Sequence, residues 1–405
     1  MSRALPSRPR PAALPGRPAQ AALLLPALLP LLVACGGAAD PKDSGGVADA
    51  GPEPFALPAD PALPGVPVGV QTATQDGVTL EIWYPAGDSV TGEPGEVVDF
   101  SVFVPSSVTD LIGPVDFPLL PTVAVRDAPL RRTDSPWPVI LFSHGFGGTR
   151  LQSLDYATHL ASRGYVVIAA DHVGRSMGDL LPCMFSPALE GCDLTGFSSD
   201  PGPAGLTAAL AWADAQAAGD WAGQIDPDTL GVSGHSAGGG STSTFGEVEQ
   251  RADALLSMAA GGDVAREVPM MLFAGSCDGI ITIEDVSSSL DGLADAQQVT
   301  ILGAGHLAFA DLCALDLLGV AERQLEGRDD LNQGIYAGLL QLASDGCAGG
   351  TPAVARSECE GGFLPLEDSA PLVRHVPTVF FDLHLRGQGA PVEPGTLPYT
   401  EVSAP

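Results

Sequence analysis

The sequence predicts an α/β fold with a mostly parallel central sheet, helices on both faces and an insertion before the C-terminal helix. Short apolar runs bounded by turn residues recur along the chain, as expected for strands buried on both faces of a sheet. Apolar residues at helical spacing, from Leu151 to Leu160, separate two of these runs. One run continues directly into Gly-x-Ser-x-Gly, a strand–turn–helix signature. The expected strands are residues 138–142, 165–170, 229–233, 269–275 and 298–302.

The Gly-x-Ser-x-Gly run predicts a nucleophilic serine. In such an elbow the serine occupies a strained turn, and the close backbone contacts require Gly234 and Gly238 to lack side chains. Because the chain has 50 glycines, the pattern also arises by chance. The residues that follow it favour Ser236 as a catalytic nucleophile.

An acid and a histidine follow Ser236 in the order that such a catalytic triad requires. Asp278 comes after the expected strand 269–275, and His306 after the strand 298–302. The alternative is a surface aspartate with a structural loop histidine. Glu284 and Asp285 are predicted to begin the next helix instead.

The other histidines are predicted to be structural. His235 adjoins Ser236 and is expected to pack behind it, and His144 belongs to the loop after residues 138–142. The remaining four are His159, His172, His375 and His384.

The glycine-rich loop 143–148 is predicted to contribute to an oxyanion hole. Loops of this kind present a backbone N–H to the nucleophile, and the residue after the serine supplies the second donor. The expected donors are the amides of Phe146 and Ala237. The alternative is a generic glycine-rich turn. The helix and strand predicted after the loop argue against this alternative.

Several runs resemble the platelet-activating-factor acetylhydrolase family and the related dienelactone-hydrolase-like and cutinase-like polyesterase groups of the α/β-hydrolase superfamily. They are PVGV (67–70), EIWYP (81–85), AVRDAP (124–129), FSHGFGGTR (142–150), AADH (169–172) and GHSAGG (234–239). The resemblance covers residues 65–310 and 376–387. It implies an α/β-hydrolase fold and an ester hydrolase with Ser236, Asp278 and His306 as its triad. Dienelactone hydrolases themselves use a cysteine at the elbow, so the serine argues against that activity.

Composition excludes several classes of partner. The chain has 49 acidic and 18 basic residues and a net charge of −31, so it repels nucleic acid and does not favour docking on anionic membranes. No nucleotide-binding glycine motif accompanies the strands, and the mechanism calls for no cofactor and no metal. We expect an ester substrate and a monomeric protein.

The N-terminus predicts export from a bacterial cell. Arginines precede the apolar stretch 21–33, which is too short to span a bilayer, and residues 1–34 resemble a lipoprotein signal peptide. Cys35 would then be lipidated and anchor the protein in a membrane; ordinary secretion is the alternative. Residues 35–65 are expected to be a disordered tether.

The six other cysteines predict disulfides, because their number is even and the protein is expected to be exported. Fifteen connectivities are possible. Pairing of neighbours gives Cys183–Cys192, Cys277–Cys313 and Cys347–Cys359, and the second bond would tie together the loops of Asp278 and His306.

Residues 66–405 are expected to form one hydrolase domain, with an insertion at about 314–371 and a closing helix at 376–385. The insertion is either a lid or packing decoration. The first functional hypothesis is a serine carboxylic ester hydrolase that forms an acyl-enzyme and whose rate rises with pH through the histidine range. A cutinase-like polyester hydrolase, a serine peptidase and an inactive surface-binding lipoprotein are the alternatives.

Overall fold

The computed structural model describes residues 65–404 except 194, 198, 291, 294, 327–358 and 360–362. Contacts divide the chain into two units, Met1–Glu53 and Pro54–Pro405, and every described residue belongs to the second. The predicted signal peptide and most of the tether therefore lie outside the described residues.

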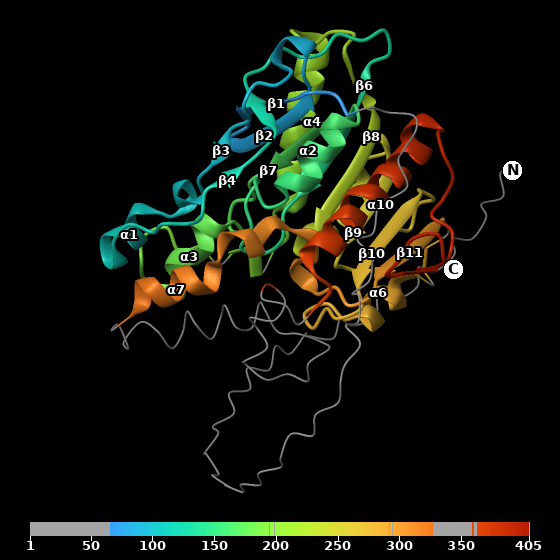
Figure 1. Ribbon diagram of the computed structural model, residues 1–405. Coiled ribbons are helices and arrows are strands. Elements are labelled where there is room, and N and C mark those ends of the chain that lie inside the picture. The colour runs from blue at the N-terminus through green and yellow to red at the C-terminus, as the bar shows by residue number, and fades with distance from the viewer. Residues whose placement is uncertain are drawn as a thin grey trace, which may run out of the picture. The chain divides into compact units, whose positions relative to one another are not determined.

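A ten-stranded sheet forms the centre of the second unit (Figure 1). Its order is β12-β11-β10-β9-β8-β6-β7-β2-β1-β5. The six strands from β11 to β7 are parallel to one another. Three pairs are antiparallel: β12 with β11, β2 with β7, and β2 with β1. The strands are β1 (Val68–Gln75), β2 (Val78–Pro85), β5 (Ala124–Arg126), β6 (Trp137–Ser143), β7 (Val166–Ala170), β8 (Ile225–His235), β9 (Ala252–Met258), β10 (Met270–Gly275), β11 (Ala296–Ile301) and β12 (Thr400–Ser403).

Helices cover both faces of the sheet, because successive strand residues point to opposite faces and both sets are apolar. Ile140 of β6 belongs to the core cluster that includes α2 (Leu154–Ser162) and α10 (Leu366–Arg386). Leu141 belongs to the opposite cluster, which includes α4 (Gly202–Ala218), α5 (Ala237–Val248) and α6 (Ile283–Leu290). The predicted α/β fold with a mostly parallel sheet is confirmed.

Residues 101–132 contain α1 (Ser106–Ile112), β4 (Leu120–Pro121), which pairs with β3 (Val97–Val98), and β5. The expected start of the closing helix was wrong. The last helix begins at Leu366 rather than Val376 and contains Pro371 and Pro377. Prolines in the interior normally disfavour a helix, but burial of Val373 and Val376 in the core outweighs this preference here.

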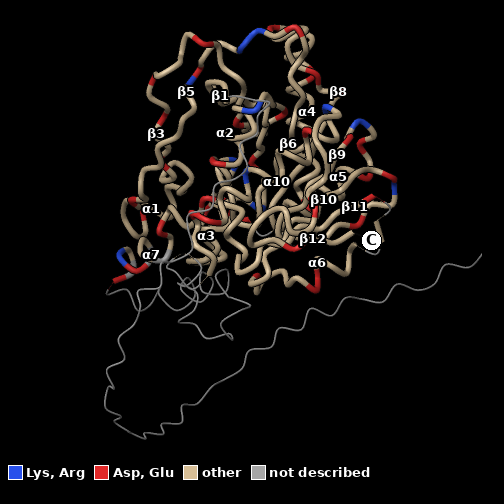
Figure 2. Tube along the Cα trace, turned by 45° about the vertical axis from the view of Figure 1, so that its right-hand side comes forward, with Lys and Arg blue, Asp and Glu red and all other residues tan. Residues whose placement is uncertain are grey.

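The remaining helices, α3 (Met177–Phe185) and α7 (Leu317–Leu325), lie near α1 (Figure 1). Acidic residues are spread along the described chain, with few basic residues between them (Figure 2). No helix within the described part of the chain has the length and apolar character of a membrane span.

Candidate active site

Ser236 occupies the turn between β8 and α5. Its backbone has φ 56° and ψ −123°, a conformation that non-glycine residues rarely adopt. The Ser236 amide donates a hydrogen bond of 2.8 Å to the Met258 carbonyl at the end of the neighbouring strand β9. Strand pairing therefore holds the serine in the strained turn, at the carboxyl ends of the parallel strands.

The glycines around Ser236 make this turn possible. A Cβ at Gly234 would overlap the carbonyl of Gly238, and a Cβ at Gly238 would overlap the carbonyl of Ser143 at the end of β6. A Cβ at Gly240, in the first turn of α5, would meet no atom within 4 Å. Gly234 and Gly238 are thus required by close backbone contacts, whereas Gly240 is not.

Gly238→Ala is expected to lower the stability by several kcal/mol, because backbone atoms that cannot rotate away must move apart. Gly240→Ala is the matched control, and it should be neutral or stabilise by about 0.5–1 kcal/mol, since alanine favours a helix. Chemical denaturation of both variants measures this difference. Equal stabilities of the two variants would contradict the proposed packing of the elbow.

Asp278 and His306 form a buried pair at the ends of the neighbouring strands β10 and β11. The Asp278 Oδ2 atom lies 2.7 Å from His306 Nδ1. Its Oδ1 atom accepts hydrogen bonds from the amides of Ile280 and Ile281, at 2.8 and 2.9 Å. The carboxylate is therefore held by three bonds, and it orients the imidazole with Nε2 on the side opposite to the acid.

Contacts between His235 and His306 place the end of β8 beside the ends of β10 and β11. The two ring centroids are 4.8 Å apart, and His235 Nε2 lies 2.9 Å from the carbonyl oxygen of His306. Because Ser236 is the next residue after His235, the structure brings the elbow and the Asp278–His306 pair together.

Hydrogen bonds, and not the expected Cys277–Cys313 disulfide, join the acid and histidine loops. The Cys277 amide donates to the Ala304 carbonyl at 2.9 Å, and the Gly303 amide donates to Ser276 Oγ at 2.8 Å. Cys313 instead bonds to Cys359, 46 residues further along the chain. The predicted pairs Cys277–Cys313 and Cys347–Cys359 are thus wrong, because folding places Cys359 of the segment before α10 beside Cys313.

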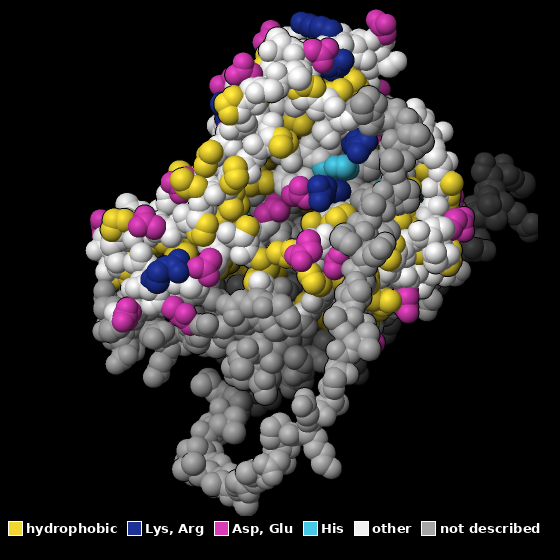
Figure 3. All heavy atoms as spheres, in the orientation of Figure 1, with side chains coloured by type: hydrophobic (Ala, Val, Ile, Leu, Met, Phe, Trp, Pro, Cys, Tyr) yellow, Lys and Arg dark blue, Asp and Glu magenta, His cyan; other side chains and the backbone are white. Residues whose placement is uncertain are grey.

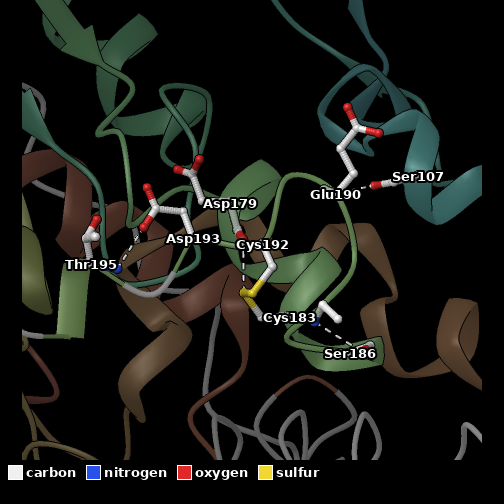
Figure 4. Close-up of a disulfide and its surroundings, with 9 residues drawn as sticks. Ser107, Asp179, Cys183, Ser186, Glu190, Cys192, Asp193 and Thr195 are labelled. Atoms are coloured by element: carbon white, nitrogen blue, oxygen red, sulfur yellow. Dashed lines mark hydrogen bonds between the residues drawn. A yellow bond between two sulfur atoms is a disulfide. The ribbon is translucent and has the colours of Figure 1, made fainter.

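The Cys183–Cys192 disulfide is present as expected (Figure 4). It closes the loop after α3, and the Ser107 hydroxyl of α1 donates a hydrogen bond of 2.6 Å to the Glu190 carbonyl in that loop. Cys277 is also disulfide-bonded. Cys347 and Cys35 lie outside the described residues.

Reduction is expected to lower the melting temperature by at least about 5 °C, because each disulfide typically contributes about 2–4 kcal/mol. Calorimetry of the Cys35→Ser chain with and without reductant measures the change. A non-reducing digest should contain peptides that link residues 183 with 192 and 313 with 359. Six free thiols in the unfolded, unreduced Cys35→Ser chain would contradict the expectation.

The loop between β6 and α2 lies against the elbow. A Cβ at Gly145 would lie 3.3 Å from Ser236 Cβ, so this stretch of backbone contacts the serine closely. Phe146 is the next residue, and Ala237 is the first residue of α5. These are the two predicted oxyanion donors, and both belong to backbone beside Ser236.

The buried Arg175 side chain and backbone hold the loop between β6 and α2 by hydrogen bonds. The side chain is 2% exposed, and its Nη2 donates to the Ser143 hydroxyl and to the His144 carbonyl, at 3.0 Å each. Its Nη1 donates to Asp200 at 2.9 Å, and its carbonyl accepts from the Gly147 amide at 2.9 Å. Burial lowers the pKa of Arg175 to about 10, which leaves the guanidinium charged at neutral pH.

The buried histidines near Ser236 are neutral. Burial, with the charge of Arg175, lowers the pKa of His144 to about 3, and burial beside His306 lowers that of His235 to about 3. His144 Nε2 accepts from the His172 amide, so His144 carries its proton on Nδ1 and donates it to the Gly145 carbonyl, 2.7 Å away. These groups therefore shape the site without titrating in the range in which a catalytic histidine works.

Asp311 links the histidine loop to the start of α2. Its Oδ2 accepts a hydrogen bond of 3.0 Å from the Asp155 amide, and its own amide donates to the Gln152 carbonyl at 2.9 Å. Burial raises the pKa of Asp311 to about 7, and the neighbouring Asp155 contributes, whereas Arg374 opposes the rise.

The raised pKa of Asp311 predicts a dependence of stability on pH. An unfolded aspartate has a pKa near 3.9, so the protonated form stabilises the fold fully below about pH 4, and this contribution is lost as pH rises to about 7. Asp311→Asn lacks this dependence. Relative to the variant, the wild type should lose on the order of 1 kcal/mol per pH unit between pH 5 and 7. Parallel stability curves for the two proteins would contradict the assignment.

Gln152 and Arg175 are buried polar residues of the site that the sequence did not reveal. Each follows a predicted motif by a few residues, and no pattern distinguishes them from surface residues. Burial of a polar side chain next to Ser236 is visible only once the strands are assembled. Within the described residues no group of three or more His, Cys, Asp or Glu side chains is placed to hold a metal ion.

Comparisons with known proteins agree with this architecture. Residues 70–180 match the family model of platelet-activating factor acetylhydrolase, isoform II. Among solved structures, a ferulic acid esterase from Streptomyces cinnamoneus is similar, with a TM-score of 0.52 and 20% sequence identity. The match covers 86% of this chain and 98% of the esterase chain. The chain therefore has an α/β-hydrolase fold, and its residues 70–180 resemble the platelet-activating factor acetylhydrolase family.

Proposed function

We propose that the protein is a serine carboxylic ester hydrolase that works through an acyl-enzyme. The observation that carries the proposal is the 2.7 Å Asp278–His306 pair beside Ser236, which occupies an elbow with a positive φ. A nucleophile, an oriented base and two backbone donors are the groups that acyl transfer requires.

In the proposed mechanism, His306 Nε2 accepts the proton of Ser236 as Oγ attacks the ester carbonyl. The amides of Phe146 and Ala237 stabilise the oxyanion of the tetrahedral intermediate. His306 then gives its proton to the departing alcohol, and the acyl group stays on Ser236. A water molecule repeats the attack with the same histidine as base and releases the acid.

The surroundings of the oxyanion loop support an ester with an apolar part. Leu180 Cδ1 of α3 would lie 3.6 Å from a Cβ at Gly147. Hydrophobic side chains also gather on the face over β3 and β4 (Figure 3), and Val97 of β3 is exposed. Within this class we propose an acetylated phospholipid as substrate, by the resemblance to platelet-activating factor acetylhydrolase. Aromatic esters, by the ferulic acid esterase likeness, and polyesters are the alternatives.

The test combines active-site labelling with a substrate panel. A fluorophosphonate probe should label the wild type, and mass spectrometry should locate the label on Ser236. The panel contains p-nitrophenyl esters, an acetylated phospholipid, a feruloyl ester, a polyester film and a peptide amide. Absence of labelling together with absence of ester turnover would overturn the proposal, and faster cleavage of the amide would favour a peptidase.

We further propose that the protein is exported and anchored through a lipid on Cys35. The Cys183–Cys192 and Cys313–Cys359 disulfides support an oxidising compartment. Expression in a bacterial host should place the wild type in the detergent phase and the Cys35→Ala chain in the aqueous phase. Equal partition of the two proteins would contradict anchoring at Cys35.

A further inference from the structure

The side chain of Gln152 joins the three segments that surround Ser236. Its Oε1 accepts a hydrogen bond of 3.0 Å from the Gly145 amide, in the loop that precedes Phe146. Its Nε2 lies 2.8 Å from His235 Nδ1. Gln152 is 1% exposed and His235 is 2% exposed, so water does not replace these bonds.

The direction of each hydrogen bond in this chain is fixed. Because Gly145 offers an N–H, the glutamine must turn its oxygen to Gly145 and its NH2 group to His235. Nδ1 of His235 therefore accepts, and its proton resides on Nε2. That Nε2–H then donates to the carbonyl oxygen of His306, 2.9 Å away.

We propose that Gln152, acting through His235, is a positioning residue that sets the oxyanion loop and the His306 loop relative to Ser236. The inference rests on the proposed function, since it assigns Gln152 a role in that reaction. Gln152 touches neither substrate nor reacting atoms. Its amide makes one bond to each side of the site, so a single side chain fixes the spacing between the oxyanion donor of Phe146 and the base.

The backbone of Gln152 makes a separate, structural contact. Its carbonyl accepts a hydrogen bond from the Asp311 amide, and the neighbouring Ser153 hydroxyl donates to the Phe309 carbonyl at 3.2 Å. Gln152→Met keeps the length of the side chain and this backbone contact, and removes only the two amide bonds. The substitution therefore tests the hydrogen bonds of the Gln152 amide to Gly145 and His235 separately from the packing of α2.

Gln298→Met is the matched control. Gln298 is 3% exposed and lies in β11, the strand that leads to His306, and its amide donates to Ser287 and Thr300 at 3.0 Å. Both variants lose buried amide bonds and should lose comparable stability. Of these two glutamines, Gln152 alone is bonded to the loops of the site.

The experiment measures kcat and KM with a p-nitrophenyl ester, the rate of fluorophosphonate labelling, and the melting temperature. For Gln152→Met we expect kcat and the labelling rate to fall about 30- to 100-fold with KM changed less than about threefold, an effect of the size seen when a donor that stabilises the transition state is displaced. For Gln298→Met we expect both rates within about threefold of the wild type. Equal kcat values for the two variants would overturn the inference.

Gln152→Glu provides a second test, which also serves if the methionine variant does not fold. The introduced carboxylate still accepts from Gly145 but cannot donate to His235, so His235 must move its proton to Nδ1 and loses the bond to His306. Protonation of this carboxylate–imidazole pair at lower pH restores a donor to the His306 carbonyl. The ratio of variant to wild-type kcat should therefore rise several-fold from pH 9 to pH 6, and a constant ratio would overturn the inference.

Failure of the inference and failure of the proposed function give different results. If wild-type protein neither hydrolyses esters nor takes the label on Ser236, the proposed function is wrong and the role of Gln152 is wrong with it. If the wild type is active and labelled while both Gln152 variants behave as the wild type does, only the positioning role is wrong.

Discussion

Ser236→Ala is expected to lower kcat/KM for a p-nitrophenyl ester by at least about 10⁴-fold and to abolish fluorophosphonate labelling. Without the Ser236 hydroxyl no acyl-enzyme forms, and only the oxyanion donors and substrate binding remain to accelerate direct attack by water. Stability should change little, because the Ser236 side chain is small and the backbone of the turn is held by its neighbours. Steady-state kinetics, labelling and thermal unfolding measure these three effects.

Ser243→Ala is the matched control for this substitution. Ser243 lies in the same helix, α5, is 5% exposed, and its hydroxyl donates to the Gly239 carbonyl. Its kcat/KM should stay within about threefold of the wild type. If Ser236→Ala kept more than about 1% of the activity, the nucleophile would have to be another residue.

Asp278→Asn is expected to lower kcat by about 10²- to 10⁴-fold and to change KM little. The carboxylate accepts from His306 Nδ1 and from two backbone amides, so it fixes both the ring orientation and the tautomer of the base. An asparagine amide can place an N–H against Nδ1, which favours the wrong tautomer and leaves Nε2 protonated. Kinetics at several pH values measure the loss.

Asp285→Asn is the control that distinguishes Asp278 from the other acidic residues that follow it in the sequence. Asp285 accepts hydrogen bonds from the amide and hydroxyl of Thr282 at the start of α6, so its loss should affect stability and leave kcat within about threefold. A large loss of kcat in Asp285→Asn with an active Asp278→Asn would exchange the two assignments.

The parallel centre of the fold was predictable from the sequence because its strands are continuous apolar runs. Residues 138–142 and 269–275 correspond closely to β6 and β10, since few other structures bury every side chain of such a run. The positions of Asp278 and His306 followed from the same reasoning, because loops after parallel strands meet at one edge of the sheet. Their hydrogen bond, however, depends on side-chain geometry that the sequence pattern does not reveal.

Only the Cys183–Cys192 pair was predicted correctly, because sequence distance is a poor guide to which of the more distant cysteines meet. Cys183 and Cys192 are joined by a short loop and pair locally, whereas Cys313 meets Cys359 only after the chain has returned to α10. The start of α10 was missed for a different reason: two prolines obscured a helix that packing stabilises.

Several residues of the quoted motifs prove to form an ion cluster away from the acid–histidine pair. Glu81 of β2 is 1% exposed and bonds to Arg126 of β5 at 2.7 Å and to Arg150 at 3.1 Å. Arg150 also pairs with Asp171, after β7, at 2.6 Å. The cluster joins β2 and β5 to Arg150, at the end of the loop that holds the proposed oxyanion donor Phe146. Runs that resemble an esterase family therefore include residues whose contacts are structural.

The positive φ of Ser236 limits which side chains could serve as the proposed nucleophile at this position. A β-branched side chain is strongly disfavoured in that backbone region, so a threonine hydroxyl could not take over the role even though its chemistry is equivalent. Cysteine has a single substituent on Cβ and would fit the same turn. The backbone at this position would therefore accept the thiol of a cysteine in place of the serine hydroxyl, but it disfavours the secondary alcohol of a threonine.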